Sequence, residues 1–202
     1  MLVRHGVTPT TGKVMPGRAA GLHLSEEGRA QAERAAERIS ALSPAPSAVY
    51  ASPMERTRET AAPIARALGV RVRTQAGLLD CAVGDWEGKP LKTLARRPEW
   101  RTVLGWPTGF QFPGGESFPE TQQRVVSTVL SLAAEHRGER IVVVSHADPI
   151  KMFLAAVAGA PLDMFQRLTI SPASISAVLL ADARPFVLCM NVTGSLTDLV
   201  PS

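Results

Sequence analysis

The sequence of 202 residues has few cysteines, few aromatic residues and no long apolar run. Cys81 and Cys189 are far apart and match no metal-binding or redox spacing. No apolar stretch approaches the roughly 20 residues that a membrane-spanning helix needs. No signal peptide is expected either, because a strand-like segment begins at once. These absences favour a protein of the reducing cytoplasm with no membrane partner.

The chain also lacks blocks of basic residues, although its net charge is +4. Lys and Arg are scattered, nearly matched by acids, and not interleaved with aromatic residues, which argues against nucleic-acid binding. A local excess of arginine around a small anion would explain the charge equally well. The fractions of 45% hydrophobic and 20% charged residues are typical of a globular protein, and we expect residues 1–202 to form a single domain.

What is present is a regular alternation of strand-like and helix-like segments. The predicted strands are Leu2–Val3, Ala48–Ala51, Val70–Arg73, Ile141–Val144, Ile175–Leu180 and Phe186–Met190. Helical spacing of apolar residues fills the intervals, and residues 7–24 and much of 77–118 read as loops. The order predicts an α/β fold, a three-layer α/β/α sandwich with a mainly parallel central sheet and an antiparallel hairpin around Ala183–Pro185 at one edge.

Several helix starts are marked by local signals. Ser25 is a good N-cap, and Ser117–Glu120 is a capping box. Ser52–Glu55 predicts a further capping box with proline at the first helical position, and Pro149 is expected to begin the helix that follows the Ile141–Val144 strand.

Two of the predicted strands end in the same way. Leu2–Val3 runs into Arg4 and His5, and Ile141–Val144 runs into Ser145 and His146. The ends of parallel strands share one edge of the sheet, so both imidazoles can face one crevice. Arg56, in the first turn of the next helix, can join Arg4 and the histidines around one anion, because guanidinium groups suit phosphate oxygens.

This set of residues can do more than bind an anion. A histidine can attack phosphorus and carry the phosphoryl group, provided that its reactive nitrogen is unprotonated. The arginines would neutralise charge on the transferring oxygens. A carboxylic acid must then protonate the leaving oxygen, and Asp80 is the best-placed candidate. His23 and His136 have no evident partners and are expected to face solvent.

These motifs together resemble the histidine phosphatase superfamily, in its phosphoglycerate mutase-like branch. The resemblance rests on five motifs in family order: Arg4-His5-Gly6, Ser52 to Ala61 with Arg56, Asp80 with Gly84-Asp85-Trp86-Glu87-Gly88, Pro113 to Ser117, and Val144-Ser145-His146. The Trp86-Glu87-Gly88 ending and Asp163–Arg167 are most similar to a group of actinobacterial proteins thought to be phosphomutases or phosphatases.

The resemblance implies a role for each matching residue. His5 would be the phosphohistidine nucleophile, Arg4, Arg56 and His146 would hold the phosphoryl oxygens, and Asp80 stands where the family places its proton donor. It also implies that no metal or other cofactor is needed, and that the protein is a cytoplasmic monomer or homodimer. Thr8 and Thr11 are further candidates for phosphate or substrate contact.

Three positions depart from the family pattern. The donor is usually Glu, so Asp80 is one methylene shorter. Many members have Asn where Thr11 stands. The usual glycine after the second histidine is Ala147, followed by Asp148, whose carboxylate could repel an anion or cap the next helix.

The sequence therefore predicts a metal-independent phosphatase that hydrolyses a small phosphorylated metabolite through a phosphohistidine. A phosphomutase is the first alternative. However, only Lys89–Phe112 separates the Asp80–Gly88 loop from Pro113, and mutases of this family have a longer insertion there. A non-catalytic phospholigand-binding module and a His-ligated metallophosphatase are weaker alternatives. Substrate choice is expected to come from residues 7–24 and 89–118.

Overall fold

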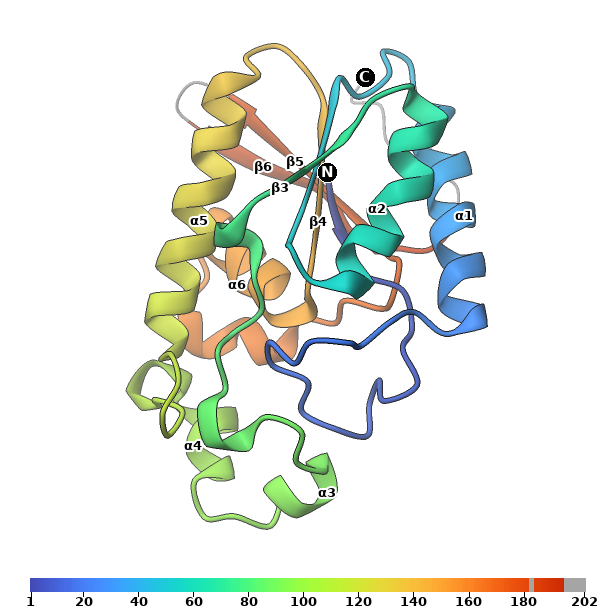
Figure 1. Cartoon of the computed structure of the whole chain (residues 1–202). Helices are drawn as coiled ribbons and strands as arrows, with labels where there is room; N and C mark the ends of the chain where they lie inside the picture. The colour runs from blue at the N-terminus through green and yellow to red at the C-terminus, as the bar shows by residue number, and fades with distance from the viewer. Residues whose placement is uncertain (182–183, 195–202) are drawn as a thin grey trace.

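The computed structural model describes residues 1–181 and 184–194 and has an α/β architecture in three layers (Figure 1). Its six-stranded sheet has the order β3-β2-β4-β1-β5-β6. The strands are β1 Leu2–Arg4, β2 Ala48–Ala51, β3 Val72–Thr74, β4 Ile141–Ser145, β5 Ile175–Ala181 and β6 Arg184–Val192. The first four are mutually parallel, whereas β5 runs antiparallel to β1 and β6 antiparallel to β5. The predicted sandwich is confirmed.

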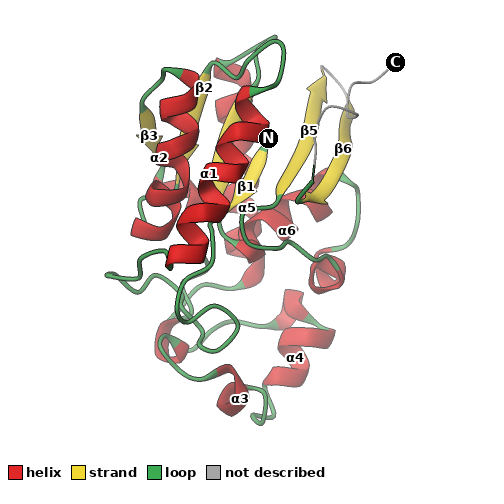
Figure 2. Ribbon diagram, turned by 90° about the vertical axis from the view of Figure 1, so that its right-hand side faces the viewer, coloured by secondary structure: helices red, strands yellow, loops and turns green. Residues whose placement is uncertain are grey.

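Helices cover both faces of the sheet, as Figure 2 shows from the side. α1 (Glu26–Ser40) and α2 (Glu55–Leu68) pack on one face, and α5 (Phe118–Glu135) and α6 (Ala147–Val157) on the other. Strand residues alternate between the two cores, so that Leu2 and Val143 belong to one and Val3 and Val144 to the other. No helix within the described ranges 1–181 and 184–194 is long and apolar enough to cross a bilayer.

The stretch between β3 and α5 is the irregular excursion that the sequence predicts. It holds the short helices α3 (Leu91–Leu94) and α4 (Trp100–Gly105) and the 3-10 turns Ala76–Leu78, Gly84–Trp86 and Pro107–Gly109. An aromatic core of its own, with Trp86 at the centre against Phe110 and Phe112, keeps it compact. A last 3-10 turn, Leu162–Arg167, packs Phe165 into the same core.

Local signals placed some boundaries correctly and others not. Ser25 caps α1, the capping box of Ser117 and Glu120 forms, and the predicted hairpin lies at the sheet edge, although Ala183 falls outside the described residues. β3 starts at Val72 rather than Val70, because the chain leaves α2 through Gly69 in the left-handed conformation. β6 begins at Arg184 and continues to Val192, beyond the predicted Phe186–Met190.

Two predicted helix starts were wrong. α2 begins at Glu55 with Met54 at the N-cap and no side-chain cap bond, so Ser52 and Pro53 lie outside the helix. α6 begins at Ala147, with His146 itself at the N-cap, two residues before Pro149. In both places a polar residue, Ser52 after β2 and His146 after β4, lies between the strand and the helix.

Candidate active site

The candidate site lies at the carboxyl edge of three neighbouring strands. β1 pairs with β4 so that Arg4 lies beside Ser145, and β2 pairs with β4 so that Ala51 lies beside Val144. His5, His146 and Ser52 follow directly. The rings of His5 and His146 lie 5.4 Å apart, centroid to centroid, in an edge-on arrangement with 64° between their planes. The predicted meeting of the two histidines is thus confirmed.

His5 is buried, and its ring is held in one orientation. Its Nδ1 donates to the carbonyl oxygen of Gly6 at 2.8 Å. A neutral imidazole with the proton on Nδ1 carries its lone pair on Nε2. Burial, followed by the nearby charge of Arg56, lowers the pKa of His5 to about 3. The ring is therefore neutral at physiological pH, with Nε2 available as a nucleophile.

Gly6 is required here by packing between chain segments. A Cβ at this position would lie 2.5 Å from the carbonyl oxygen of Gly28 in α1. The Gly6 N–H donates to the hydroxyl of Thr60 in α2 at 3.0 Å. The absence of a side chain at Gly6 therefore allows helix α1 to approach the end of β1. The segment that follows His5 is consequently fixed between α1 and α2, both helices of one layer.

His146 is held from the other side by Ser52. Nε2 of His146 lies 2.9 Å from the Ser52 hydroxyl, and Nδ1 lies 3.6 Å from Oδ2 of Asp80. Burial, with Arg56 next, lowers the pKa of His146 well below its ordinary value. Sequence reasoning missed this role of Ser52, which was assigned to a helix cap, yet its position at the end of β2 was a usable signal.

Arg4 and Arg56 bring cationic groups into the same buried space. Nη1 of Arg4 donates to the Ile170 carbonyl at 2.6 Å, and Nη2 of the fully buried Arg56 donates to the Gly17 carbonyl at 2.8 Å. Burial lowers the pKa of both guanidiniums. Four buried nitrogens of these side chains have no hydrogen-bond partner within the described residues: Arg4 Nε, Arg56 Nε and Nη1, and His146 Nδ1. Such a set of donors can bind an oxyanion.

Asp80 stands between these groups. Its Oδ2 lies 3.7 Å from Nη2 of Arg56, and its Oδ1 accepts from the Cys81 N–H at 3.0 Å. Burial raises the pKa of Asp80 to about 7, against the opposing charge of Arg56 and with help from Asp148. Its carboxyl is therefore substantially protonated near neutral pH and can donate a proton.

The loop of residues 7–24 is anchored rather than free. Thr8 is buried and its N–H donates to the Thr11 hydroxyl at 2.9 Å, while the two hydroxyls lie 2.9 Å apart. These two threonines therefore stabilise a turn next to His5. Farther along, Met15 N–H donates to the Lys89 carbonyl, so this loop lies against the start of the 89–118 excursion. The two segments expected to choose the substrate are neighbours.

Three side chains without a predicted role surround Asp80. Arg18 Nε and Arg124 Nη2 donate to the Asp80 carbonyl oxygen at 2.9 and 3.2 Å, and both guanidiniums also bind the carboxylate of Glu116. Glu116 belongs to a motif that sequence reasoning singled out for resemblance alone. Arg18 and Arg124 carried no local signal, since isolated arginines in a loop and a helix are common.

Other predictions need adjustment. His23 faces solvent as expected, but both histidines have partners, which corrects the other part of the expectation: His23 pairs with Glu59, and His136 contacts Glu139 and Tyr50. Asp148 does not cap α6 through its side chain, and it lies 3.6 Å from Lys151. The exposed Glu87 accepts from the Arg18 backbone N–H at 2.8 Å, so it supports the 7–24 loop.

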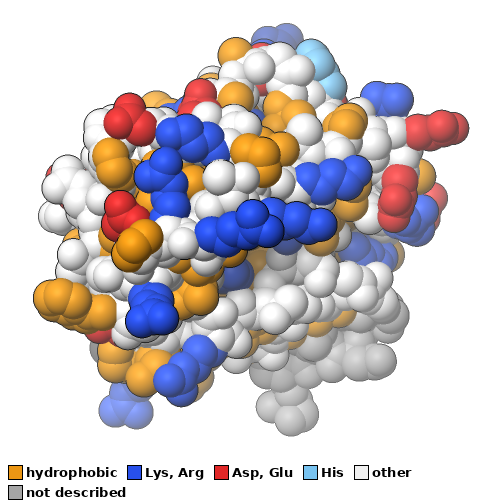
Figure 3. Space-filling view, turned by 90° about the horizontal axis from the view of Figure 1, so that it is seen from below, with side chains coloured by type: hydrophobic (Ala, Val, Ile, Leu, Met, Phe, Trp, Pro, Cys, Tyr) orange, Lys and Arg blue, Asp and Glu red, His pale blue; other side chains and the backbone are white. Residues whose placement is uncertain are grey.

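The face that carries the 7–24 loop and the 89–118 excursion is rich in Lys and Arg, and these side chains run across the middle of Figure 3.

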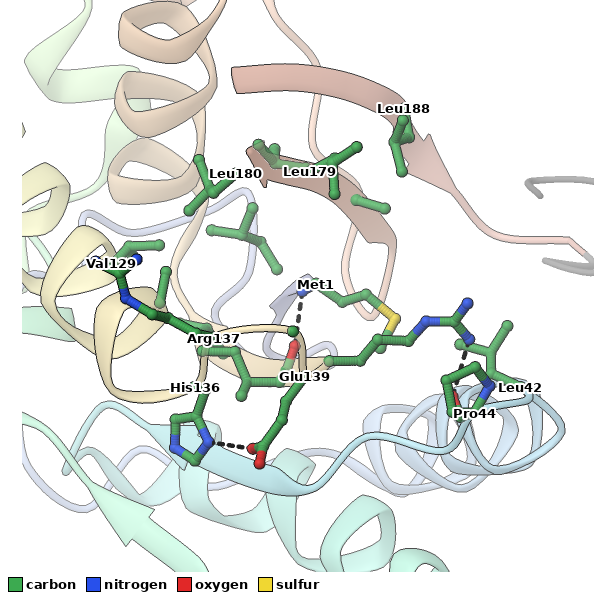
Figure 4. Close-up of a pocket in the computed structure, with 18 of the residues that line it drawn as sticks. Met1, Leu42, Pro44, Val129, His136, Arg137, Glu139, Leu179, Leu180 and Leu188 are labelled. Carbon is green, nitrogen blue, oxygen red and sulfur yellow. Dashed lines mark hydrogen bonds and ion pairs between the residues drawn. The ribbon is translucent and has the colours of Figure 1, made fainter. Parts of the chain in front are cut away.

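A separate hollow, shown in Figure 4, lies at the other end of the strands, between leucines of β5 and β6 and the segment from His136 to Arg140. It contains none of the predicted site residues. The described part of the chain also holds no cluster of three or more metal-ligating His, Cys, Asp or Glu side chains.

Comparison with known proteins places this geometry in a family. The family model described as "Histidine phosphatase superfamily (branch 1)" matches residues 1–193. The chain belongs to the histidine phosphatase superfamily. Phosphoserine phosphatase 1 of Hydrogenobacter thermophilus is 30% identical over 187 residues, which cover 90% of this chain and 88% of that protein.

Other members of the superfamily differ in length and name. Bifunctional protein Rv2228c of Mycobacterium tuberculosis is 33% identical over 97% of this chain, but the chain spans only about half of it, 54%. Among solved structures, Bacillus stearothermophilus YhfR has a TM-score of 0.87 at 25% identity, with 98% of each chain covered. A mycobacterial glucosyl-3-phosphoglycerate phosphatase, Rv2419c, has a TM-score of 0.77 at 27% identity, covering 87% of this chain and 86% of its own.

Proposed function

We propose that this histidine phosphatase hydrolyses a small-molecule phosphomonoester through a phosphohistidine on His5. One observation carries the proposal: a neutral histidine with a free Nε2 lies beside two buried arginines with unpaired N–H groups and a carboxyl whose pKa is raised to about 7. Nucleophile, anion-binding donors and acid are the three parts that phosphoryl transfer to histidine needs.

The reaction proceeds in two displacements. Nε2 of His5 attacks phosphorus, the bond from phosphorus to the ester oxygen breaks, and the proton of the Asp80 carboxyl goes to that oxygen. Water then attacks the phosphohistidine, the phosphorus–nitrogen bond breaks, and the Asp80 carboxylate accepts a proton from the water. Arg4, Arg56 and His146 hold the phosphoryl oxygens in both steps, where fixed donors in a buried site act most strongly.

The proposed reaction fixes further properties of the protein. His5, the arginines and Asp80 supply every chemical role, so we propose a metal-independent, cofactor-free enzyme. We further propose that residues 1–202 form one catalytic domain that works in the cytoplasm as a monomer or homodimer. Thr8 and Thr11 support the phosphate site through their turn.

The direct test is a panel of phosphorylated metabolites scored for released phosphate. Phosphoserine and glucosyl-3-phosphoglycerate come first because relatives are named for them. We expect wild-type activity on at least one compound, unchanged by a chelator, and its loss in His5→Ala. The matched control is His23→Ala, which removes an exposed histidine outside the site. Full activity of His5→Ala would exclude the mechanism.

A second candidate is a phosphomutase, because a relative at 30% identity, covering 88% of this chain, is named probable phosphoglycerate mutase. Mutase action requires the phosphohistidine to return its phosphoryl group to the substrate before water reaches it. With 3-phosphoglycerate, phosphate release is expected to outpace formation of 2-phosphoglycerate. The opposite ratio would establish the mutase.

A further inference from the structure

Among the described residues, the Pro113–Ser117 segment makes no hydrogen bond to His5, Arg4 or Arg56, yet it carries the most heavily hydrogen-bonded carboxylate near the site. Glu116 accepts from Arg18 Nη2 at 2.7 Å and from Arg124 Nη2 and Nε at 2.8 and 3.1 Å. It also accepts from the Ala82 N–H at 3.1 Å and the Thr121 hydroxyl at 3.0 Å. Five donors on one carboxylate fix its position on every side.

Both arginines held by Glu116 also hold the main chain at Asp80. Arg18 Nε and Arg124 Nη2 share the Asp80 carbonyl oxygen, and Arg124 Nη1 donates to the carbonyls of Gly77 and Leu79 at 3.0 and 2.9 Å. The guanidinium spreads its N–H groups over three nitrogens, so each arginine can span the carboxylate and the loop, whereas a lysine has a single nitrogen. The loop from Gly77 to Ala82 is thus tied to Glu116 on both sides of Asp80.

Backbone contacts lock the same two segments together. Glu116 N–H donates to the Ala82 carbonyl and Asp85 N–H to the Pro113 carbonyl, both at 2.8 Å. A Cβ at Gly115 would lie 2.1 Å from the Ala82 oxygen, and a Cβ at Gly84 would lie 2.1 Å from the Pro113 oxygen. No side chain fits between the segments, so Glu116 is held in register with Asp80.

The charge of Glu116 is stable across the working pH range. Burial alone would raise its pKa, but the hydrogen bonds from Arg124, Ala82 and Arg18 lower the pKa to about 2. Glu116 therefore neither donates nor accepts a proton near neutral pH. It can act on the reaction only through other groups and not by transferring a proton itself.

We propose that Glu116 is a positioning residue for the proton donor, acting through Arg18 and Arg124 on Asp80. This inference rests on the proposed function. The carboxyl of Asp80 is one methylene shorter than the Glu usual in the family, so its reach to the leaving oxygen depends on where the main chain is held. Glu116 sets that position, whereas His5, Arg4 and His146 are held by other partners, which are the Gly6 and Ile170 carbonyls and the Ser52 hydroxyl.

Two esters with different leaving groups distinguish a positioning role of Glu116 from a general structural one. An alkyl ester such as phosphoserine needs the proton of Asp80, whereas 4-nitrophenolate leaves as a stable anion. The readout is kcat/KM for both esters, because it reports the steps up to release of the first product. In Glu116→Gln we expect a loss of about 100-fold for phosphoserine, the low end of general acid catalysis, and less than about 3-fold for 4-nitrophenyl phosphate. Asp80→Asn should show the same selective pattern.

The controls keep the two proposals apart. Wild-type hydrolysis of both esters and its loss in His5→Ala test the proposed function alone, and the ratio of the two losses tests the role of Glu116. Glu33→Gln removes an exposed carboxylate paired with Arg66 and should change neither value. Equal losses for both esters in Glu116→Gln, or no loss for phosphoserine, would overturn the inference. If Glu116→Gln does not fold, Arg18→Gln, in a partly exposed loop position, decides by the same ratio.

Discussion

The hydroxyl of Ser52 lies 2.9 Å from Nε2 of His146, and this leaves the other ring nitrogen, Nδ1, 3.6 Å from Oδ2 of Asp80. If the hydroxyl donates to Nε2, the proton of the neutral ring is on Nδ1, facing the centre of the site. In the proposed mechanism, this tautomer is the one in which His146 can donate to a phosphoryl oxygen. The end of β2 thus contributes to a site whose histidines come from β1 and β4.

Ser52→Ala is expected to lower kcat/KM about tenfold, because a net hydrogen bond of about 1.4 kcal/mol no longer selects the tautomer. The free energy of unfolding should fall by about 1–3 kcal/mol, since Nε2 becomes a buried group without a partner. Kinetics and chemical denaturation measure the two effects. Ser131→Ala, an exposed change on α5, should alter neither. Unchanged kinetics in Ser52→Ala would show that the tautomer does not depend on this hydroxyl.

The pH dependence of activity should follow the carboxyl of Asp80. Its pKa is raised to about 7, so the protonated form that donates a proton prevails below pH 7 and is lost above it. The value of kcat/KM for an alkyl ester should therefore fall about tenfold per pH unit above neutrality. His5, with its pKa lowered to about 3, stays neutral throughout this range. Asp80→Asn should abolish the alkaline decline, whereas the exposed Asp85→Asn should keep it. A decline that persists in Asp80→Asn would assign it to another group.

The same pKa affects stability with a definite sign. Between pH 4 and 7 the folded chain keeps a proton on Asp80 that the unfolded chain, with a pKa near 3.8, has released. The free energy of unfolding therefore falls as pH rises through this window. Asp80→Asn removes this dependence, so its stability relative to wild type should rise from pH 4 to 7 by up to about 4 kcal/mol. Urea denaturation at several pH values measures the difference, and parallel profiles for the two proteins would contradict it.

Arg56→Lys should weaken both the hydrogen bond to the Gly17 carbonyl and the binding of an anion, although it keeps the positive charge. A lysine carries all its N–H groups on one nitrogen, so it cannot reach the Gly17 carbonyl and a phosphoryl oxygen from separate atoms as the guanidinium of Arg56 can. We expect kcat/KM to fall about 100-fold or more, together with a loss of stabilisation by inorganic phosphate in thermal unfolding. Arg58→Lys is the matched control, since Arg58 is exposed on the same helix. Phosphate stabilisation of Arg56→Lys equal to wild type would place the anion elsewhere.

Gly115→Ala tests the close approach between the Pro113–Ser117 segment and the loop from Gly77 to Ala82 that contains Asp80. The new Cβ would meet the Ala82 carbonyl oxygen, which belongs to the backbone and cannot rotate away. Overpacking of this kind should lower the free energy of unfolding by about 1–3 kcal/mol and reduce activity on alkyl esters. Gly105→Ala has open space around its Cβ and should leave activity unchanged. Equal stability of the two variants would show that the segments can separate at little cost.

How much the sequence could predict depends on the range of each signal. The layers and the parallel sheet followed from the alternation of short apolar runs with amphipathic helices, which is a local property. The capping box at Ser117 formed as predicted, whereas that at Ser52 did not. A serine with a free hydroxyl can cap a helix or bond to any neighbour that the fold brings near. Here His146, 94 residues away in sequence, takes that bond.

The sequence by itself determined which residues could do the chemistry. Two histidines at strand ends, two arginines and an acid in a loop were identifiable because residue type and the end of a strand-like run are local properties. Only the tertiary structure decided their state. The burial that lowers the pKa of His5 and raises that of Asp80 comes from packing of distant segments. The hydrogen bonds that link Glu116, Arg18 and Arg124 to the loop from Gly77 to Ala82 also come from packing of distant segments. A network among residues scattered along the chain leaves no recognisable pattern in the amino-acid sequence.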